Sequence, residues 1–345
     1  MSTLTETQID PAKIMQVGMG FWASKTLLTA VNMGLFSQLA QGGLSSNDIK
    51  TKLGLHDRGL HDFLDTLVAL GFLNRTGLNG TSVYANTPET NMFLDKNKPS
   101  YVGGMLEMSN NRLYRFWDNL EEGLKTGLPQ NEIKTGDRPL FEEIYADEHR
   151  LREFLAGMGG IQMGNFIALA HKFDFSKYST LCDLGDAGGY LSAQVAMQNN
   201  NMSCISFDLP PVGPVAQENI DKMGLADRVQ IQSGDFFTDE FPQVDVITMG
   251  NVLHDWGTTD KKRLITKAFE ALPEGGAMVV IENIIDDNRS ENAFGLMMSL
   301  NMLIETPDGY DFTAANFNEW VLGAGFSRTE TMPLTGPSSA VIAIK

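Results

Sequence analysis

The chain has 345 residues, 42% of them hydrophobic, and a formal net charge of −17. This length and hydrophobic content are sufficient for a large core and predict a globular protein of two domains. The acidic residues are scattered along the chain, and such a charge disfavours nucleic acid and anionic membranes as partners. The two cysteines, Cys182 and Cys204, lie in apolar runs. This favours buried thiols in a reducing compartment, so we expect a cytoplasmic protein.

The most apolar early stretch, residues 14–36, contains Lys25 and Asn32 and follows a polar start without a basic region. It therefore fits neither a signal peptide nor a membrane span, and we expect a buried helix. Its apolar side offers more surface than the core of a small domain needs, which predicts a homodimer. The residues on that side are Ile14, Val17, Phe21, Leu27, Leu28 and Val31.

Up to about residue 100 the apolar spacing is helical, with a turn-linked pair of short strands over residues 74–87. This is the pattern of a winged-helix domain, which we assign to residues 1–100. The helix from Asp57 carries Asp62 and Asp65 on its polar side. A DNA-recognition helix needs cations there, so we expect this helix to dock against protein. A winged-helix regulator whose second domain senses a ligand is a rival hypothesis.

The second domain, residues 101–345, begins with a helical lead-in over 101–175 that is interrupted by a Gly- and Pro-containing loop at 123–141. Apolar, β-branched runs then alternate with helical segments, which predicts a doubly wound, parallel α/β sheet. The last two strands, 325–334 and 338–345, are joined by the short turn TGP. Since that turn leaves no room for a crossover helix, we expect an antiparallel hairpin at the sheet edge.

Ligands of such a sheet bind outside the carboxyl ends of its strands. The first strand is followed by DLGDAGG, in which Gly185, Gly188 and Gly189 permit a tight turn and close approach of the backbone to a ligand. Asp186 in this loop disfavours a pyrophosphate and therefore a dinucleotide, whereas a cationic or zwitterionic cofactor would tolerate it. Asp186 could equally cap the following helix.

The next two strands also end in candidate binding residues. Asp208 ends the second strand, where a carboxylate can accept hydrogen bonds from a ribose diol. After the third strand, Asp235 could accept from an adenine amino group and Phe236 could cover the ring. The alternatives are a plain acid at a strand end for Asp208, a turn residue for Asp235 and a core residue for Phe236.

The fourth strand runs into NVLHDW and places His254 just beyond its carboxyl end. We expect Asp255 and Trp256 to begin the next helix. Glu282 ends the fifth strand, and Asp311 follows in ETPDGYDFT with Glu305. An imidazole beside carboxylates is a general-base arrangement, in which the acids orient the ring and stabilise its protonated form. His254, Glu282 and Asp311 could also form a metal site, but no Cys/His cluster supports one and we predict no metal.

The chain resembles the class I S-adenosylmethionine-dependent O-methyltransferases of the plant phenolic and acetylserotonin type and their bacterial natural-product relatives. The resemblance covers almost the whole length and is most specific in HDW followed by ALPEGG. It implies an N-terminal winged-helix dimerisation domain, S-adenosylmethionine as cofactor, and methylation of a hydroxyl on a small aromatic or polyketide-like molecule. A C- or N-methyltransferase of the same fold is the alternative.

The resemblance also implies roles for individual residues. His254 matches the general base, and Glu282 and Asp311 match the two acids that flank it. The positions that match cofactor contacts are Gly185, Asp208, Asp235, Phe236 and Gly250.

Three residues depart from the family pattern. Asp186 lies in a loop that is usually richer in glycine, Gly250 replaces a lysine of the plant enzymes, and Asp311 is one methylene shorter than the family's glutamate. The acceptor pocket is less defined, since large apolar residues are often plain core. Its candidates are Trp22, reaching in from a partner subunit, and Trp117, Met158, Met163, Met298 and Met302.

Overall fold

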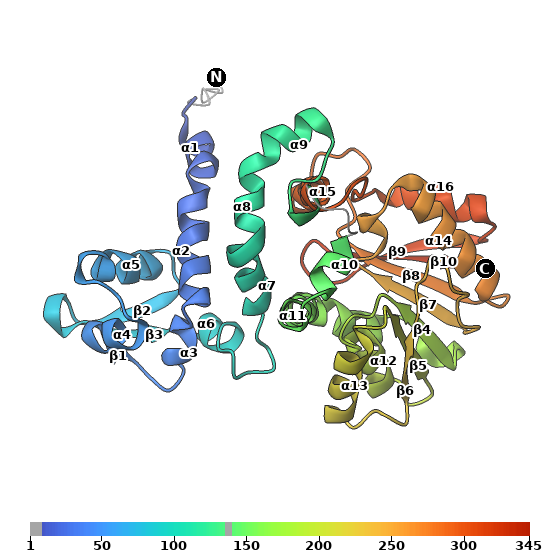
Figure 1. The fold of residues 1–345 in the computed structure, drawn as a ribbon, viewed down its shortest axis with the longest axis horizontal. Coiled ribbons are helices and arrows are strands. Elements are labelled where there is room, and N and C mark those ends of the chain that lie inside the picture. Colours follow the sequence, from blue (N-terminus) through green and yellow to red (C-terminus); the bar gives the residue numbers. More distant parts are fainter. Residues whose placement is uncertain (1–8, 135–139) are drawn as a thin grey trace, which may run out of the picture. The chain divides into compact units, whose positions relative to one another are not determined.

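The computed structural model describes residues 9–134 and 140–345. The polar start, residues 1–8, and residues 135–139 of the predicted loop lie outside the described residues. The chain divides into two compact units, Met1–Asn111 and Arg112–Lys345. Figure 1 shows the elements of each unit.

The first unit combines short helices with a small antiparallel sheet, in which β3 pairs with both β1 and β2. Helix α5 begins after His56, whose ring accepts the Arg58 N–H at 3.1 Å. Leu60, Leu64 and Leu67 lie on one face of α5 and are buried in the core of the unit. The elements are α1 (Ala12–Gly18), α2 (Gly20–Asn32), α3 (Leu35–Gln38), β1 (Leu44–Ser45), α4 (Ser46–Leu53), α5 (Asp57–Ala69), β2 (Leu73–Thr76), β3 (Val83–Asn86), α6 (Pro88–Phe93) and α7 (Gly103–Met108).

The apolar stretch at residues 14–36 spans α1, α2 and the start of α3, and its exposure differs between these helices. Leu28 and Val31 of α2 are buried, as expected. The expectation of a buried helix is wrong for α1, where Ile14 is 75% and Val17 74% exposed. No side chain of α1 is buried, and the core of the unit is formed by residues of later elements. The apolar surface of α1 is therefore available to another molecule.

The second unit contains a seven-stranded sheet in the order β6-β5-β4-β7-β8-β10-β9. The first five strands in this order are parallel, whereas β10 pairs antiparallel with β8 and with β9. The predicted doubly wound sheet and its antiparallel C-terminal hairpin are thus confirmed. The strands are β4 (Thr180–Leu184), β5 (Ser203–Asp208), β6 (Val229–Ser233), β7 (Val246–Gly250), β8 (Ala277–Glu282), β9 (Arg328–Pro333) and β10 (Ser339–Ile344).

Helices cover both faces of this sheet, so the central strands are buried and read as apolar runs. Helices α14 and α16 pack on one face, and α11, α12 and α13 contribute to the core on the other (Figure 1). The helices of the unit are α8 (Tyr114–Phe116), α9 (Leu120–Thr126), α10 (Leu140–Tyr145), α11 (Glu148–Lys172), α12 (Tyr190–Gln198), α13 (Gly213–Lys222), α14 (Thr258–Ala271), α15 (Ala293–Glu305) and α16 (Ala314–Ala324).

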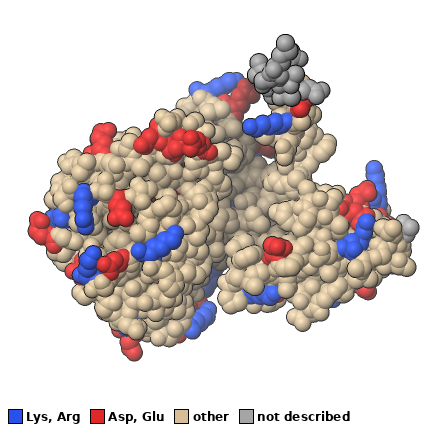
Figure 2. Space-filling model, turned by 180° about the vertical axis from the view of Figure 1, so that it is seen from behind, with Lys and Arg blue, Asp and Glu red and all other residues tan. Residues whose placement is uncertain are grey.

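The face seen in Figure 2 shows no basic patch. On that face Lys and Arg are interspersed with Asp and Glu among uncharged residues. Among the described residues, no helix combines the length and apolar character needed to cross a bilayer.

Candidate active site

The glycine loop after β4 is held in a conformation that favours glycine. Gly185 has φ +77°, and a Cβ there would lie 2.8 Å from Cγ2 of Val252. Ala187 also has a positive φ, +53°, and its N–H donates to Oδ2 of Asp208 at 2.8 Å. The loop is therefore fixed to the end of β5, and Gly185 lies close to Val252 in the segment that carries His254.

Two acids are buried at this loop. Asp183, in β4, accepts from the Thr248 hydroxyl at 2.6 Å, and burial raises the pKa of its carboxyl well above the usual range. Asp186 accepts from the Leu191 N–H at 3.3 Å, and burial raises its pKa to about 6. The Oδ2 atom of Asp186 is buried without a hydrogen-bond partner among the described residues. Asp186 therefore contacts the start of α12 and keeps one acceptor atom unused.

Asp208 is the last residue of β5 and is half-buried. Its Oδ1 accepts from the Leu209 N–H at 2.7 Å, in addition to the bond that Oδ2 accepts from Ala187. Burial raises the pKa of Asp208 to about 6, although these two bonds act in the opposite direction. Each carboxylate oxygen has a second lone pair, so Asp208 can still accept hydrogen bonds from a ligand.

The third candidate segment is a turn after β6. Oδ1 of Asp235 accepts from the Phe237 N–H at 2.8 Å, and the Asp235 N–H donates to Asp239 at 2.8 Å. The ring of Phe236 lies edge-on to Phe237 and to Trp256, with centroids 4.9 and 6.0 Å apart. Asp235 is thus a turn residue in this structure, beside a half-buried aromatic group.

Two residues at the end of β7 have unusual surroundings: Gly250 has space for a side chain, and Asn251 has a strained backbone. A Cβ at Gly250 would make only an ordinary contact with Phe166 at 3.5 Å, so a side chain could be accommodated there. Asn251 has a left-handed φ of +56°, which is uncommon for a non-glycine residue. Its Oδ1 is buried without a hydrogen-bond partner among the described residues. Such strained and unsatisfied groups are concentrated at functional sites.

His254 lies just beyond β7 and is 4% exposed. Its Nδ1 is 3.4 Å from Oε2 of Glu282 and 3.4 Å from Oδ1 of Asp311. Glu282, at the end of β8, also accepts the backbone N–H of His254 at 3.2 Å. On the other side of the ring, Nε2 is 3.5 Å from Oδ1 of Asp255. The structure thus brings together the three residues that the sequence predicted for proton transfer.

The charges around the imidazole strongly favour its protonated form. Burial lowers the pKa of His254, but Glu282, Asp255 and Asp311 more than compensate and raise it to about 10. Burial raises the pKa of Glu282 to about 8, while His254 acts in the opposite direction. Since these groups interact closely, they share protons and titrate together. The ligand atoms of His254, Glu282 and Asp311 lie within 4.8 Å of one another, so the cluster could also accommodate a cation.

Asp255 and Trp256 differ from expectation because they precede the next helix. Leu253–Asp255 form a 3₁₀ turn, and α14 begins at Thr258. Asp255 consequently faces the His254 ring, and burial raises its pKa to about 6. The indole of Trp256 packs against Phe237 at 4.6 Å between centroids.

The candidates for an acceptor pocket are distributed over both units. Helix α15 packs beside the turn that carries His254, and it contains Met298 and the buried Met302. The indole N–H of Trp117 donates to Asn301 of the same helix at 2.9 Å. Met158 and Met163 are half-buried on α11. Trp22 belongs to the first unit, where it is 62% exposed.

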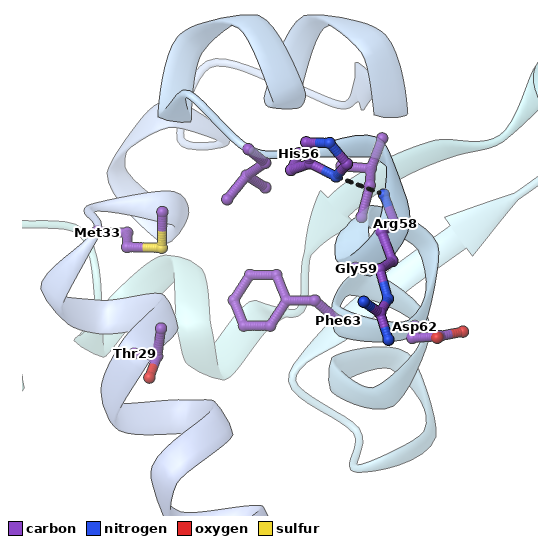
Figure 3. Close-up of a pocket in the computed structure, with 9 residues that line it drawn as sticks. Thr29, Met33, His56, Arg58, Gly59, Asp62 and Phe63 are labelled. Atoms are coloured by element: carbon purple, nitrogen blue, oxygen red, sulfur yellow. Dashed lines mark hydrogen bonds between the residues drawn. The ribbon is translucent and has the colours of Figure 1, made fainter.

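A separate pocket of about 550 Å³ lies entirely within the first unit (Figure 3). The ring of Phe63 points toward Met33 and Thr29, and the charged side chains of Arg58 and Asp62 lie beside it. This pocket has no group of acids around an imidazole comparable to the cluster at His254. We therefore place the candidate active site in the second unit.

Sequence reasoning missed Asn251 and Lys261. Asn251 could have been suspected from its place between a strand end and the HDW motif. Lys261 is fully buried on α14, on the same face as Leu264, Ile265 and Ala268. The signal was a lysine at a position where helical spacing predicts an apolar side chain.

Comparison with known proteins identifies the family. Residues 117–327 match the O-methyltransferase domain, and residues 15–96 match the O-methyltransferase dimerisation domain. The chain is 37% identical to the tetracenomycin polyketide synthesis 8-O-methyl transferase TcmO of Streptomyces glaucescens, over 97% of each protein. It is 29% identical to the N,N-dimethyltransferase OxyT of Streptomyces rimosus, over 94% of each. The human N-acetylserotonin methyltransferase, solved in complex with SAM, superposes with a TM-score of 0.91 at 25% identity, over 100% of this chain and 99% of that one.

The matched domains cover most of the chain, and TcmO is similar over nearly its full length. The chain belongs to the S-adenosylmethionine-dependent O-methyltransferase family.

Proposed function

We propose that this enzyme methylates a hydroxyl group of a small aromatic, polyketide-like molecule, with His254 as the general base. The observation that carries the proposal is the buried imidazole between the acids on its Nδ1 side and Asp255 on its Nε2 side. It lies at the same sheet edge as the glycine loop, where a doubly wound fold binds its ligands. The similarity to TcmO over nearly the whole chain supports a polyketide-type acceptor.

S-adenosylmethionine supplies a methyl group on a cationic sulfonium, which is already electrophilic. The described residues fit this cofactor, because Asp186 and Asn251 have buried, unpartnered oxygen atoms near the loop and strand end that would bind it. Asp208 would accept from the ribose diol and Gly185 would allow close approach of the methionyl part. Asp235 and Phe236 would contact the adenine, and Gly250 would leave space beside it.

The residues of the chain then have to align the acceptor oxygen and remove its proton. Glu282 and Asp311 hold the Nδ1 side of His254, so the proton of the acceptor hydroxyl would go to Nε2, which Asp255 faces at 3.5 Å. The same acids stabilise the imidazolium that results. Since the methyl group needs no further activation, we assign this cluster to proton transfer rather than to a metal ion.

The two units would contribute differently to this function. We assign residues 1–100 to a winged-helix-like dimerisation domain and residues 101–345 to a catalytic domain with a helical lead-in. The exposed apolar side of α1 and the match to a dimerisation domain support a homodimer. Trp117, Met158, Met298 and Met302 would line the acceptor pocket, with Trp22 supplied by the partner. The two buried, free cysteines suit the cytoplasm.

The test has two stages. A thermal-shift titration should show stabilisation by S-adenosylmethionine. The purified enzyme is then incubated with the cofactor and 1,8-dihydroxyanthraquinone, N-acetylserotonin or matched aromatic amines, with and without EDTA. Mass spectrometry should find methylated phenol and an EDTA-insensitive rate. Methylation of the amines alone would contradict the proposal and favour N-methylation, the activity that OxyT is named for.

A further inference from the structure

Lys261 occupies an unusual place for a lysine. It is fully buried on the inner face of α14. Its ammonium donates to the carbonyl oxygens of Trp256 at 2.5 Å and Tyr310 at 2.9 Å, and it lies 3.5 Å from the centroid of the Tyr310 ring. Burial of a charged amine is costly unless such partners compensate for the lost water. An apolar side chain would satisfy the helical pattern, so the lysine must contribute something else.

The two carbonyl groups belong to the two segments that carry the base and one of its acids. Trp256 follows His254 by two residues, and Tyr310 directly precedes Asp311. These segments pack tightly, because a Cβ at Gly309 would lie 2.6 Å from the carbonyl oxygens of both His254 and Asp255. Lys261 therefore joins the backbones of both segments at the point where they meet.

The charge of Lys261 also suits its surroundings. Burial lowers the pKa of Lys261 to about 8, whereas the charges of Glu282, Asp311 and Asp255 act in the opposite direction. These are the acids that surround His254. An ammonium in this position offsets part of the negative charge that accumulates around the imidazole.

A second lysine on α14 makes an analogous set of contacts at the other half of the site. Lys267 is half-buried and donates to the carbonyl oxygens of Phe236 and Asp239, both at 2.6 Å. These carbonyl groups belong to the turn after β6 that contains Asp235. Helix α14 thus supplies both lysines: Lys261 bonds to the segments that carry the base and its acid, and Lys267 bonds to the turn that we assign to adenine binding.

We propose that Lys261 and Lys267 are positioning residues with separate tasks. Lys261 holds the His254 and Asp311 segments together for methyl transfer, and Lys267 holds the turn at 235–239 for cofactor binding. Neither lysine contacts the reacting atoms. The assignment rests on the proposed function, in which those two segments and that turn have different roles.

The experiment compares Lys261→Met and Lys267→Met with Lys262→Met. Lys262 is exposed on the same helix, and within residues 9–134 and 140–345 its ammonium makes just a 3.9 Å ion pair with Glu319, so it is a matched control. Three quantities are measured in the full-length protein: the Kd of S-adenosylmethionine by calorimetry, the single-turnover rate with 1,8-dihydroxyanthraquinone, and amide hydrogen exchange of the ligand-free protein. Melting temperatures are recorded alongside.

Lys261→Met should lower the single-turnover rate by about 10- to 100-fold, because a small misplacement of a base is costly, and leave the Kd nearly unchanged. Exchange should increase at residues 254–258 and 306–311. Lys267→Met should weaken cofactor binding by roughly tenfold and increase exchange at 235–239. Lys267→Arg, which keeps a donor on a half-buried side chain, should restore most of the affinity.

Equal effects of the two substitutions on Kd and rate would overturn the proposal, because they would indicate general destabilisation. Exchange at 254–258 and 306–311 that is the same in Lys261→Met and Lys262→Met would also overturn it. If the wild-type enzyme binds S-adenosylmethionine but methylates no phenol, the proposed function fails. The Kd and exchange measurements still decide the assignment of both lysines in that case.

Discussion

Replacement of Glu282 by Gln tests the base assignment sharply, because it removes a charge beside His254 and leaves the imidazole in place. The acids raise the pKa of His254 from 6.5 to about 10 against the opposing effect of burial. Three carboxylates produce this rise. Glu282 makes the largest contribution of the three, so loss of its charge should lower the His254 pKa by at least about one.

The direction in which Glu282→Gln changes the rate depends on which protonation state of His254 is active. Neutral imidazole accepts the proton, so the rate rises about tenfold per pH unit below the pKa and levels off above it. Glu282→Gln should therefore move the rising part of the profile to lower pH by at least about one unit. Because the pKa of Glu282 is about 8, this shift should appear above about pH 8, where the wild-type Glu282 carboxyl is ionised. His254→Ala should instead lower the rate by roughly 100-fold or more and remove the rise.

The assay is single-turnover methyl transfer from pH 6 to 10, with cofactor affinity and melting temperature measured for each variant. A Glu282→Gln profile that superimposes on the wild-type profile would refute the charge argument. Equal rates for wild type and an equally stable His254→Ala protein would exclude His254 as the base. Stability gives an independent check. Since the folded pKa of His254 is raised, its stabilising contribution is complete below about pH 6.5 and is lost as the pH rises through about 10.

Three further outcomes are expected. Asp208→Ala should weaken S-adenosylmethionine binding by on the order of 2 to 3 kcal/mol, because the ribose would lose charge-assisted hydrogen bonds. Unchanged affinity by calorimetry would show that Asp208 does not recognise the ribose. Light scattering at micromolar concentration should report a dimer that Ile14→Glu converts to monomer, since Ile14 is 75% exposed on α1; a monomeric wild type would contradict this. The pKa of Asp186 is raised to about 6, so its carboxyl destabilises the fold as the pH rises from 4 to 6. Asp186→Asn should consequently raise the melting temperature at pH 8 but not at pH 4, and no difference at pH 8 would count against a buried charge.

The local pattern of the sequence was sufficient to predict the sheet and the edge at which the site forms. The sequences of β4, β7 and β8 are apolar runs because helices cover both faces of these strands. A motif that directly follows such a run must lie at the carboxyl edge of a parallel sheet. The position of His254 and that of Glu282 could thus be predicted from sequence order.

Contacts between distant segments were decided only by the tertiary structure. The sequence contains Asp255 next to His254, but the 3₁₀ turn before α14 makes its carboxylate face Nε2. The burial of Lys261 depends on a loop about fifty residues later in the chain, whose Tyr310 carbonyl accepts from its ammonium. The exposure of α1 likewise depends on which surfaces the rest of its unit leaves uncovered. Periodicity describes one element at a time, whereas these features arise where separate elements pack together, and packing is a property of the folded chain.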